Sequence, residues 1–175
     1  MGLLVVETSG DGSDISISGW THVPGSPVVD IADATGSKLQ VLYKFAQYDW
    51  ASGAPTNEPN VTIPDTGDHQ VGGIYVFRGV DTSLPFADTE AGSKTTASTT
   101  ATLPAVTTAY NDCMILLVCG RPNDQGATNR FSTAVNANLT GITALIEGGT
   151  TSGNGGGFSV QYGILEAAGN TGTSV

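Results

Sequence analysis

The sequence predicts an all-β fold, a two-sheet antiparallel β-sandwich of the jelly-roll or immunoglobulin type. Its apolar runs are short, rich in β-branched and aromatic residues, and bounded by Gly, Pro, Asn and Asp. Apolar residues do not keep the helical period over any long stretch. Charged residues make up only 13% of the chain and glycine occurs 24 times, which is typical of short strands joined by many turns. We therefore expect a single domain, residues 1–175, that buries a core without disulfide bonds.

About eleven segments have the length and composition of strands, at a spacing typical of a sandwich. In chain order they are Leu3–Glu7, Ile15–Ile17, Trp20–Val23, Leu39–Ala46, Asn60–Ile63, Gln70–Arg78, Thr99–Thr102, Met114–Cys119, Arg130–Thr133, Ile142–Glu147 and Gly157–Leu165.

Two of these strands alternate between apolar and more polar side chains, which indicates one packed face and one wet face. The packed faces are formed by Leu39, Val41, Tyr43 and Phe45 in the first strand and by Phe158, Val160, Tyr162 and Ile164 in the second.

Both cysteines lie in one continuous apolar run, Cys113–Cys119. Six residues of strand span about 20 Å, too far for the two thiols to pair with each other on that strand. Their even spacing puts both on one face, as small core residues. A catalytic thiol would need an electropositive, partly exposed setting, which this run does not offer.

The strand that begins at Gly73 runs into a tight polar corner that ends at Asp88. Arg78, Asp81 and Asp88 are expected to fix this corner as structural residues, with the guanidinium paired to a carboxylate. The alternative is that Asp81 and Asp88 act as the acid and base of a glycosidase, but nothing in their spacing demands it.

Two polar clusters have a ligand interpretation and a turn interpretation. Asp65–His69 offers carboxylate and imidazole groups to a metal, and Asp11–Asp14 offers oxygens to Ca²⁺ without the bidentate Glu of an EF-hand loop. Asp, Gly, Ser and Thr are also the residues that turns prefer, and we favour turns at both places. Neither His22 nor His69 lies near a Gly-x-Ser-x-Gly motif. The sequence thus predicts no catalytic residue, metal or cofactor, and a protein that is not an enzyme.

Four residues are the best candidates for contact with a partner or a glycan. Tyr48 and Trp50 flank the start of a long polar loop, and Arg121 and Asn123 belong to the loop Gly120–Asn129. Trp20, between Gly19 and Thr21, is expected to belong to the core.

The net charge is −10, and the six Lys and Arg residues are scattered along the sequence. A nucleic-acid surface needs clustered cations, so we do not expect one. No run reaches the length of a transmembrane helix, and the first seven residues read as a strand rather than a signal peptide or an anchor.

The order of several motifs resembles a family of phage and prophage virion-associated β-sandwich proteins, and the resemblance spans nearly the whole chain. The motifs are Leu3–Val6, Ser18–Thr21, Leu39–Ala46, Glu58–Ile63, Tyr75–Asp81, Leu103–Thr108 and Cys113–Val118. The resemblance implies a structural virion protein that decorates a capsid or forms a module of a head or tail fibre. It also implies homo-oligomers and contacts with other virion proteins, on an extracellular particle assembled in the host cytoplasm.

The family pattern usually continues with strands before the first motif and after the segment matched by Gly169–Thr173. Either this sequence is a stretch of a longer protein that has those strands, or the terminal strands come from elsewhere. A sandwich without them would expose an unpaired edge, which a neighbouring subunit could complete by strand addition. The alternative function is a carbohydrate- or receptor-binding module of a tail or adhesin, which would attach to a host surface glycan.

Overall fold

The computed structural model describes residues 1–31, 35–45, 68–96, 98–122 and 131–175. Within these ranges the chain forms strands and irregular segments but no helix, so no helix there could cross a membrane. The fold is therefore all-β, as the composition predicts. The strands are β1 (Gly2–Ser9), β2 (Thr21–His22), β3 (Val28–Val29), β4 (Ser37–Lys44), β5 (Gln70–Val76), β6 (Thr107–Thr108), β7 (Cys113–Arg121), β8 (Thr140–Thr150), β9 (Gly156–Leu165) and β10 (Gly169–Asn170).

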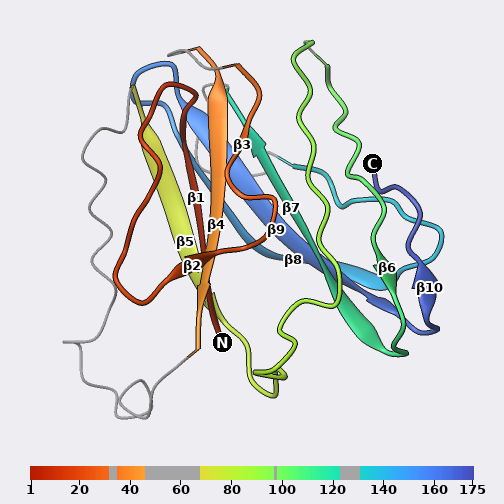
Figure 1. Cartoon of the computed structure of the whole chain (residues 1–175). Coiled ribbons are helices and arrows are strands. Elements are labelled where there is room, and N and C mark those ends of the chain that lie inside the picture. Colours follow the sequence, from red (N-terminus) through yellow and green to blue (C-terminus); the bar gives the residue numbers. More distant parts are fainter. Residues whose placement is uncertain (32–34, 46–67, 97, 123–130) are drawn as a thin grey trace.

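The first sheet is antiparallel and centred on β1, with the order β2-β4-β1-β5 (Figure 1). The short strand β3 pairs with β4 beside β2. Along β1, Val5 lies between Val41 of β4 and Gly73 of β5, and Glu7 lies between Leu39 and Val71. This register places Glu7 on the same face as Val5, because side chains alternate along a strand.

The second sheet has the order β7-β9-β8 and is also antiparallel. Its register is regular between β7 and β9 but shifts at two places between β8 and β9. A separate two-stranded ladder joins β6 to β10, next to a bridge between Leu103 and Ser174.

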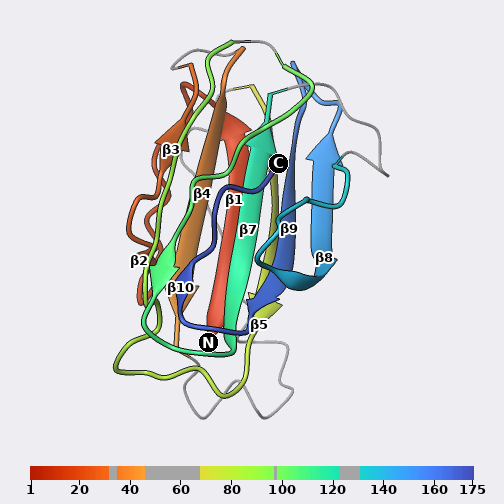
Figure 2. The same ribbon diagram turned by 90° about the vertical axis from the view of Figure 1, so that its right-hand side faces the viewer.

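The two main sheets pack face to face, as in a β-sandwich (Figure 2). Strand β1 contacts β9, β4 contacts β7, and β5 contacts β8. The layer between them is centred on Leu3, Val5, Phe158 and Val160, all of which are almost fully buried. Of the apolar faces predicted for β4 and β9, Leu39, Val41, Tyr43, Phe158 and Val160 belong to this layer.

The outer face of each sheet is covered by an irregular segment rather than by another sheet. Ile15 packs on Leu4, Val6 and Leu42 of the first sheet, where Trp20 lies half-buried against the same cluster. A similar cluster lies on the second sheet. It consists of Leu117, Leu139 and Leu165, and Ala134 packs against it.

A buried glutamine fastens each covering segment in the same way. The side chain of Gln40 accepts a hydrogen bond from Ile15 N at 2.7 Å and donates one to Ser13 O at 3.2 Å. The side chain of Gln161 accepts one from Ala134 N at 2.8 Å and donates one to Ser132 O at 2.9 Å. Each amide therefore satisfies the backbone groups of two residues in an irregular segment, as a neighbouring strand would.

Most of the predicted strands that fall within the described ranges are confirmed, but Ile15–Ile17 and Thr99–Thr102 are not strands. Ile15 is buried through its side chain while its backbone bonds to Gln40, so burial there does not need strand pairing. In the second segment, the hydroxyl of Ser98 accepts a bond from Thr100 N, a local contact that competes with a ladder. Residues 131–133 are not a strand either, and Asn60–Ile63 lies outside the described residues.

Candidate functional site

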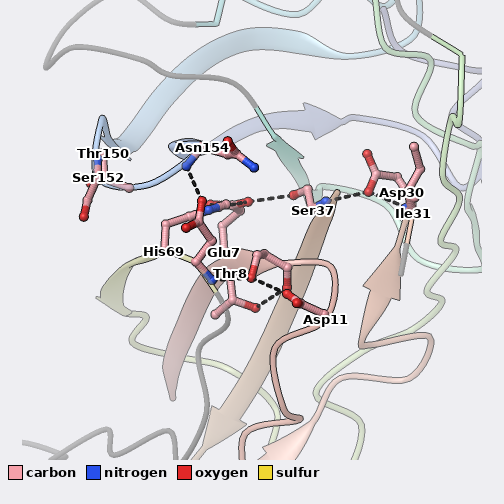
Figure 3. A network of polar contacts seen from close by, with 12 residues as sticks. Glu7, Thr8, Asp11, Asp30, Ile31, Ser37, His69, Thr150, Ser152 and Asn154 are labelled. Carbon is pink, nitrogen blue, oxygen red and sulfur yellow. Dashed lines mark hydrogen bonds and ion pairs between the residues drawn. The ribbon is translucent and has the colours of Figure 1, made fainter. Parts of the chain in front are cut away.

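The most concentrated polar arrangement in the described residues is a buried cluster of Glu7, His69 and Ser37 at one end of the layer between the sheets (Figure 3). Glu7 is on the inner face of β1, Ser37 opens the neighbouring strand β4, and His69 immediately precedes β5. Since β1 lies between β4 and β5, the pairing of the sheet brings the three side chains together.

The cluster is held by short hydrogen bonds in a setting closed to solvent. His69 Nε2 lies 3.0 Å from Glu7 Oε1 and 3.2 Å from Glu7 Oε2. Ser37 Oγ donates to Glu7 Oε1 at 2.8 Å. The side chains of Glu7 and His69 are both 0% exposed. A buried carboxyl group needs such partners because it has lost its hydration.

Glycines in the second sheet allow its backbone to close over the cluster. A methyl group at Gly156 of β9 would overlap both the Glu7 carboxylate and the His69 ring. A methyl group at Gly120 of β7 would lie 3.5 Å from Glu7 Cγ, in ordinary contact. The close approach at Gly156 therefore requires glycine.

The turn between β8 and β9 is tied to the same end of the first sheet. The Asp68 carboxylate accepts a hydrogen bond from Asn154 N, and Asp68 N donates to Ser9 Oγ at 2.8 Å. Gly153, next to Asn154, has φ of +60°, a left-handed conformation that glycine adopts easily. The glycine-rich segment that follows β8 is thus fixed by Asp68 and lies beside the buried cluster.

Burial raises the pKa of Glu7 to about 8, well above its ordinary value near 4.5. The hydrogen bond from Ser37 opposes this shift, and the negative charge of Asp30 adds to it. Asp30 is held nearby because its Oδ1 accepts from Ser37 N at 2.5 Å. The Glu7 carboxyl group therefore keeps its proton near neutral pH.

The arrangement has the groups of an acid–base pair but not the access that catalysis requires. A general acid or base must reach a substrate within hydrogen-bond distance, directly or through one water. Glu7 and His69 have no exposed surface, and Ser37 is also buried. What the cluster can do is join β1, β4 and the start of β5 and respond to pH, while Asp68 beside it holds the β8–β9 turn.

The structure corrects the expected ion pair at the polar corner. Arg78, Asp81 and Asp88 are exposed, and among the described residues no ion pair joins Arg78 to either carboxylate. Asp81 Oδ1 instead accepts from Ser83 N at 2.8 Å and Ser83 Oγ at 2.7 Å, which lowers the pKa of Asp81. Asp88 accepts from Thr89 N at 2.9 Å and Thr107 N at 2.7 Å. Asp81 thus bonds within its own loop, whereas Asp88 also ties its loop to the backbone of β6, and neither aspartate needs an arginine as its partner.

Of the four residues predicted to contact a partner or glycan, Tyr48, Trp50 and Asn123 lie outside the described residues. Arg121 ends β7, is half-buried, and its guanidinium lies 5.2 Å from the ring centroid of Phe131. This stacking is a cation–π contact within the protein.

The turn interpretation accounts for what the structure describes of the two polar clusters. Asp65, Thr66 and Gly67 lie outside the described residues, whereas Asp68 lies in a turn. Asp11 accepts a hydrogen bond from Ser9 Oγ at 2.7 Å, and Asp14 pairs with Lys38 at 3.0 Å. No group of three metal-ligating side chains gathers in the described part of the chain.

Sequence reasoning missed Glu7 and Ser37 and placed His69 in a turn. One signal was available for Glu7: it is in phase with Leu3 and Val5 on a strand whose inner face is otherwise apolar. A glutamate at such a position is either buried with the apolar residues or marks the end of the strand. Glu7 is buried, and β1 continues to Ser9.

A second feature is an apolar cavity of about 540 Å³ on the side of the molecule where β4 and β7 face each other. The first sheet contributes Val23, Val28 and Val41 to its wall, and β7 contributes Leu116 and Val118. Residues 84–92 and 103–108 form much of the remaining wall.

Comparisons of the chain with protein-family models, curated proteins and solved structures found no match.

Proposed function

We propose that the chain is a non-enzymatic structural protein of a phage virion, a jelly-roll- or immunoglobulin-like sandwich that decorates a capsid or forms part of a head or tail fibre. It acts through protein–protein contacts. The observation that carries this proposal is the distribution of side chains: the acid–base groups of Glu7 and His69 are sealed inside, while large apolar side chains lie outside. In the described part of the chain, the large apolar side chains that are exposed are Ile31, Ile74, Val76, Leu84, Tyr110, Met114, Val135 and Val175.

These exposed residues suit binding because the surrounding surface carries few charges. Charged residues are 13% of the chain, and polar groups are mostly the hydroxyls and amides of Ser, Thr and Asn. Protein interfaces are depleted in charge at their centre and enriched in apolar and aromatic side chains. On β5, Ile74 and Val76 are two residues apart and therefore project from the same face of an edge strand.

The motifs that resemble the virion family also support the proposal, since they coincide with structural elements. Leu3–Val6 forms half of β1, and Cys113–Val118 forms most of β7. The resemblance therefore involves the strands that build the sheets rather than the loops alone.

The test is to locate the protein on purified phage particles. Quantitative mass spectrometry should find it in a fixed number of copies per particle, and gold-labelled antibodies should place it at one site on the head, tail or fibre. A non-structural phage protein made at the same time is the control and should be absent from the particles. A chain that is abundant in the lysate but missing from washed particles would contradict the proposal.

A further inference from the structure

The apolar cavity adjoins the layer between the sheets and leaves part of that layer unfilled. Val41 of β4 and Leu116 and Val118 of β7 belong to the layer and also line the cavity. These three side chains are only half-buried, whereas Phe158 and Val160 of the same layer are almost fully buried. The cavity therefore takes the place of apolar contacts that the side chains of β4 and β7 would otherwise make.

The outer wall of the cavity is formed by the same chain and is fixed by specific hydrogen bonds. Residues 84–92 and 103–108 form much of this wall, on the side of the sandwich where β4 faces β7 (Figure 1). The two segments are joined where Asp88 Oδ2 accepts from Thr107 N at 2.7 Å. Thr171 bonds to the backbone of the second segment through its N at 2.9 Å and through its Oγ1 at 3.0 Å. The wall is thus a defined part of the fold, and an occupant of the cavity has to be small enough to lie behind it.

The volume and the lining of the cavity are those of a ligand site. The cavity has a volume of about 540 Å³. Pockets for small molecules commonly have about 300–1,000 Å³ and mostly apolar walls. The free-energy cost of an empty apolar cavity increases with its volume, and a water molecule gains little there because it needs several polar partners. An apolar molecule gives these walls the contacts that neither a void nor water supplies.

Apolar surface continues from the walls of the cavity to the solvent. Leu84 is 45% exposed, Tyr110 is 56% exposed and Met114 is 43% exposed, and all three line the cavity. Exposed apolar patches commonly mark grooves that bind a ligand. Leu84 belongs to the outer wall and Met114 to β7, so an apolar molecule can enter between the wall and the sheet.

The charges around the cavity select the kind of ligand. The charged side chains that line it are those of Asp81, Asp88 and Glu90, and all three are acidic. Among the described residues no Lys, Arg or His side chain lines the cavity. The amino group of Met1 also lies at the wall, where it donates to Phe77 O at 2.7 Å. An anionic ligand would therefore meet three carboxylates and no cationic side chain, which disfavours its binding.

We propose that this cavity is a binding site for an apolar small molecule without a negative charge, with the chemistry of a long-chain alcohol or amine. The hydrocarbon part contacts the half-buried side chains of β4 and β7, and the polar end lies near the carboxylates of the outer wall. This inference does not rest on the proposed function. Its test uses the isolated chain, and the location of the protein on particles is decided by its own experiment.

The first experiment is calorimetric titration of the whole chain with three probes that share one alkyl chain: decanol, decylammonium and decanoate. We expect decanol and decylammonium to bind at one molecule per chain, and decanoate to bind at least tenfold more weakly because of its charge. The change in heat capacity on binding should be negative, as burial of apolar surface requires. The proposal is overturned if none of the probes binds, or if decanoate binds as tightly as decanol.

The second experiment places the bound probe in the cavity. Val118→Trp fills the cavity from β7 and should weaken the binding of decanol at least tenfold. Val135→Trp is the matched control and should bind decanol as the wild type does, because Val135 is exposed and does not line the cavity. If Val118→Trp does not fold, Ala87→Trp blocks the cavity from an exposed position of the outer wall. Undiminished binding in a folded variant of this kind overturns the site.

A third experiment tests the selection by charge. Glu90 is exposed, so Glu90→Lys should leave the fold intact. We expect this variant to bind decanoate severalfold more tightly than the wild type does, because the ammonium group can pair with the carboxylate of the probe. Glu166→Lys makes the same change in net charge at an exposed residue that does not line the cavity, and it should leave the binding of decanoate almost unchanged. An equal gain in both variants would show that net charge controls binding, and it would overturn the placement of the polar end near Glu90.

Discussion

Glu7 places an ionisable side chain where the neighbouring inward residues, Leu3 and Val5, form the core. The site accepts it because Ser37 and His69 occupy its oxygens and because the group is neutral near pH 7. The negative charge of Asp30 raises the pKa of Glu7 further, and Asp68, which precedes His69 in the chain, is engaged with Asn154. Burying the protonated acid avoids most of the cost of burying a charge.

We predict that the free energy of unfolding falls as pH rises from about 4.5 to about 8, because the folded chain keeps a Glu7 proton that the unfolded chain has lost. The stabilisation by the Glu7 proton is complete below about pH 4.5 and is lost above about pH 8. Its size is on the order of a few kcal/mol, at about 1.4 kcal/mol for each unit of pKa difference. Urea denaturation of the wild type and Glu7→Gln across this range checks it. The free energy of unfolding should depend less on pH in Glu7→Gln. The dependence should persist in the control Glu166→Gln, which changes an exposed acid. An unchanged dependence in Glu7→Gln would refute the raised pKa of Glu7.

At the scale of elements, the irregular segments around Ile15 and Ala134 behave as part of the fold because Gln40 and Gln161 bond to their backbones. The sequence showed Gln40 only as a polar residue on the outer face of an alternating strand. The predicted face is confirmed, but the expectation that this face is exposed to solvent is wrong at Gln40, which is fully buried. Periodicity assigns a side chain to one face of a strand. Whether that face is exposed to solvent depends on the irregular segment that covers the sheet, here the segment around Ile15.

We predict that Gln40→Ala and Gln161→Ala each lower the free energy of unfolding by about 1–3 kcal/mol, because buried backbone groups lose their partners. Amide hydrogen exchange should show faster exchange at Ile15 in the first variant and at Ala134 in the second. Gln70→Ala, at an exposed position of β5, is the control and should change neither. Retained protection of both amides in the variants would show that the glutamines do not fasten these segments.

For the whole molecule, the layer between the two sheets is the feature that makes them one unit. Phe158 of β9 is fully buried in it, next to the inner residues of β1. The cavity beside β7 leaves the layer less filled on one side, so cohesion depends mainly on the contacts of β9 with β1 and β5 and of β8 with β5.

We predict that Phe158→Ala costs about 3–5 kcal/mol and lowers the melting temperature of the whole chain in one transition, because both sheets lose the same core contact. Calorimetry and circular dichroism should report coincident midpoints. Val135→Ala removes an apolar side chain that is mostly exposed and should leave the midpoint nearly unchanged. Separate transitions for the two probes would mean that the sheets do not unfold together.

The strand class and the faces of β4 and β9 could be predicted from the sequence, because alternation and β-branched composition act locally. It also located the apolar run of β7. The meeting of His69 with Glu7 and Ser37 depends on the tertiary structure, since the two residues Glu7 and His69 are 62 positions apart and strand pairing closes that distance. The same holds for the bond of Asp88 to Thr107 and for the position of β7 at the edge of its sheet. Which strand becomes an edge depends on the pairing of all the others, and no local pattern carries that information.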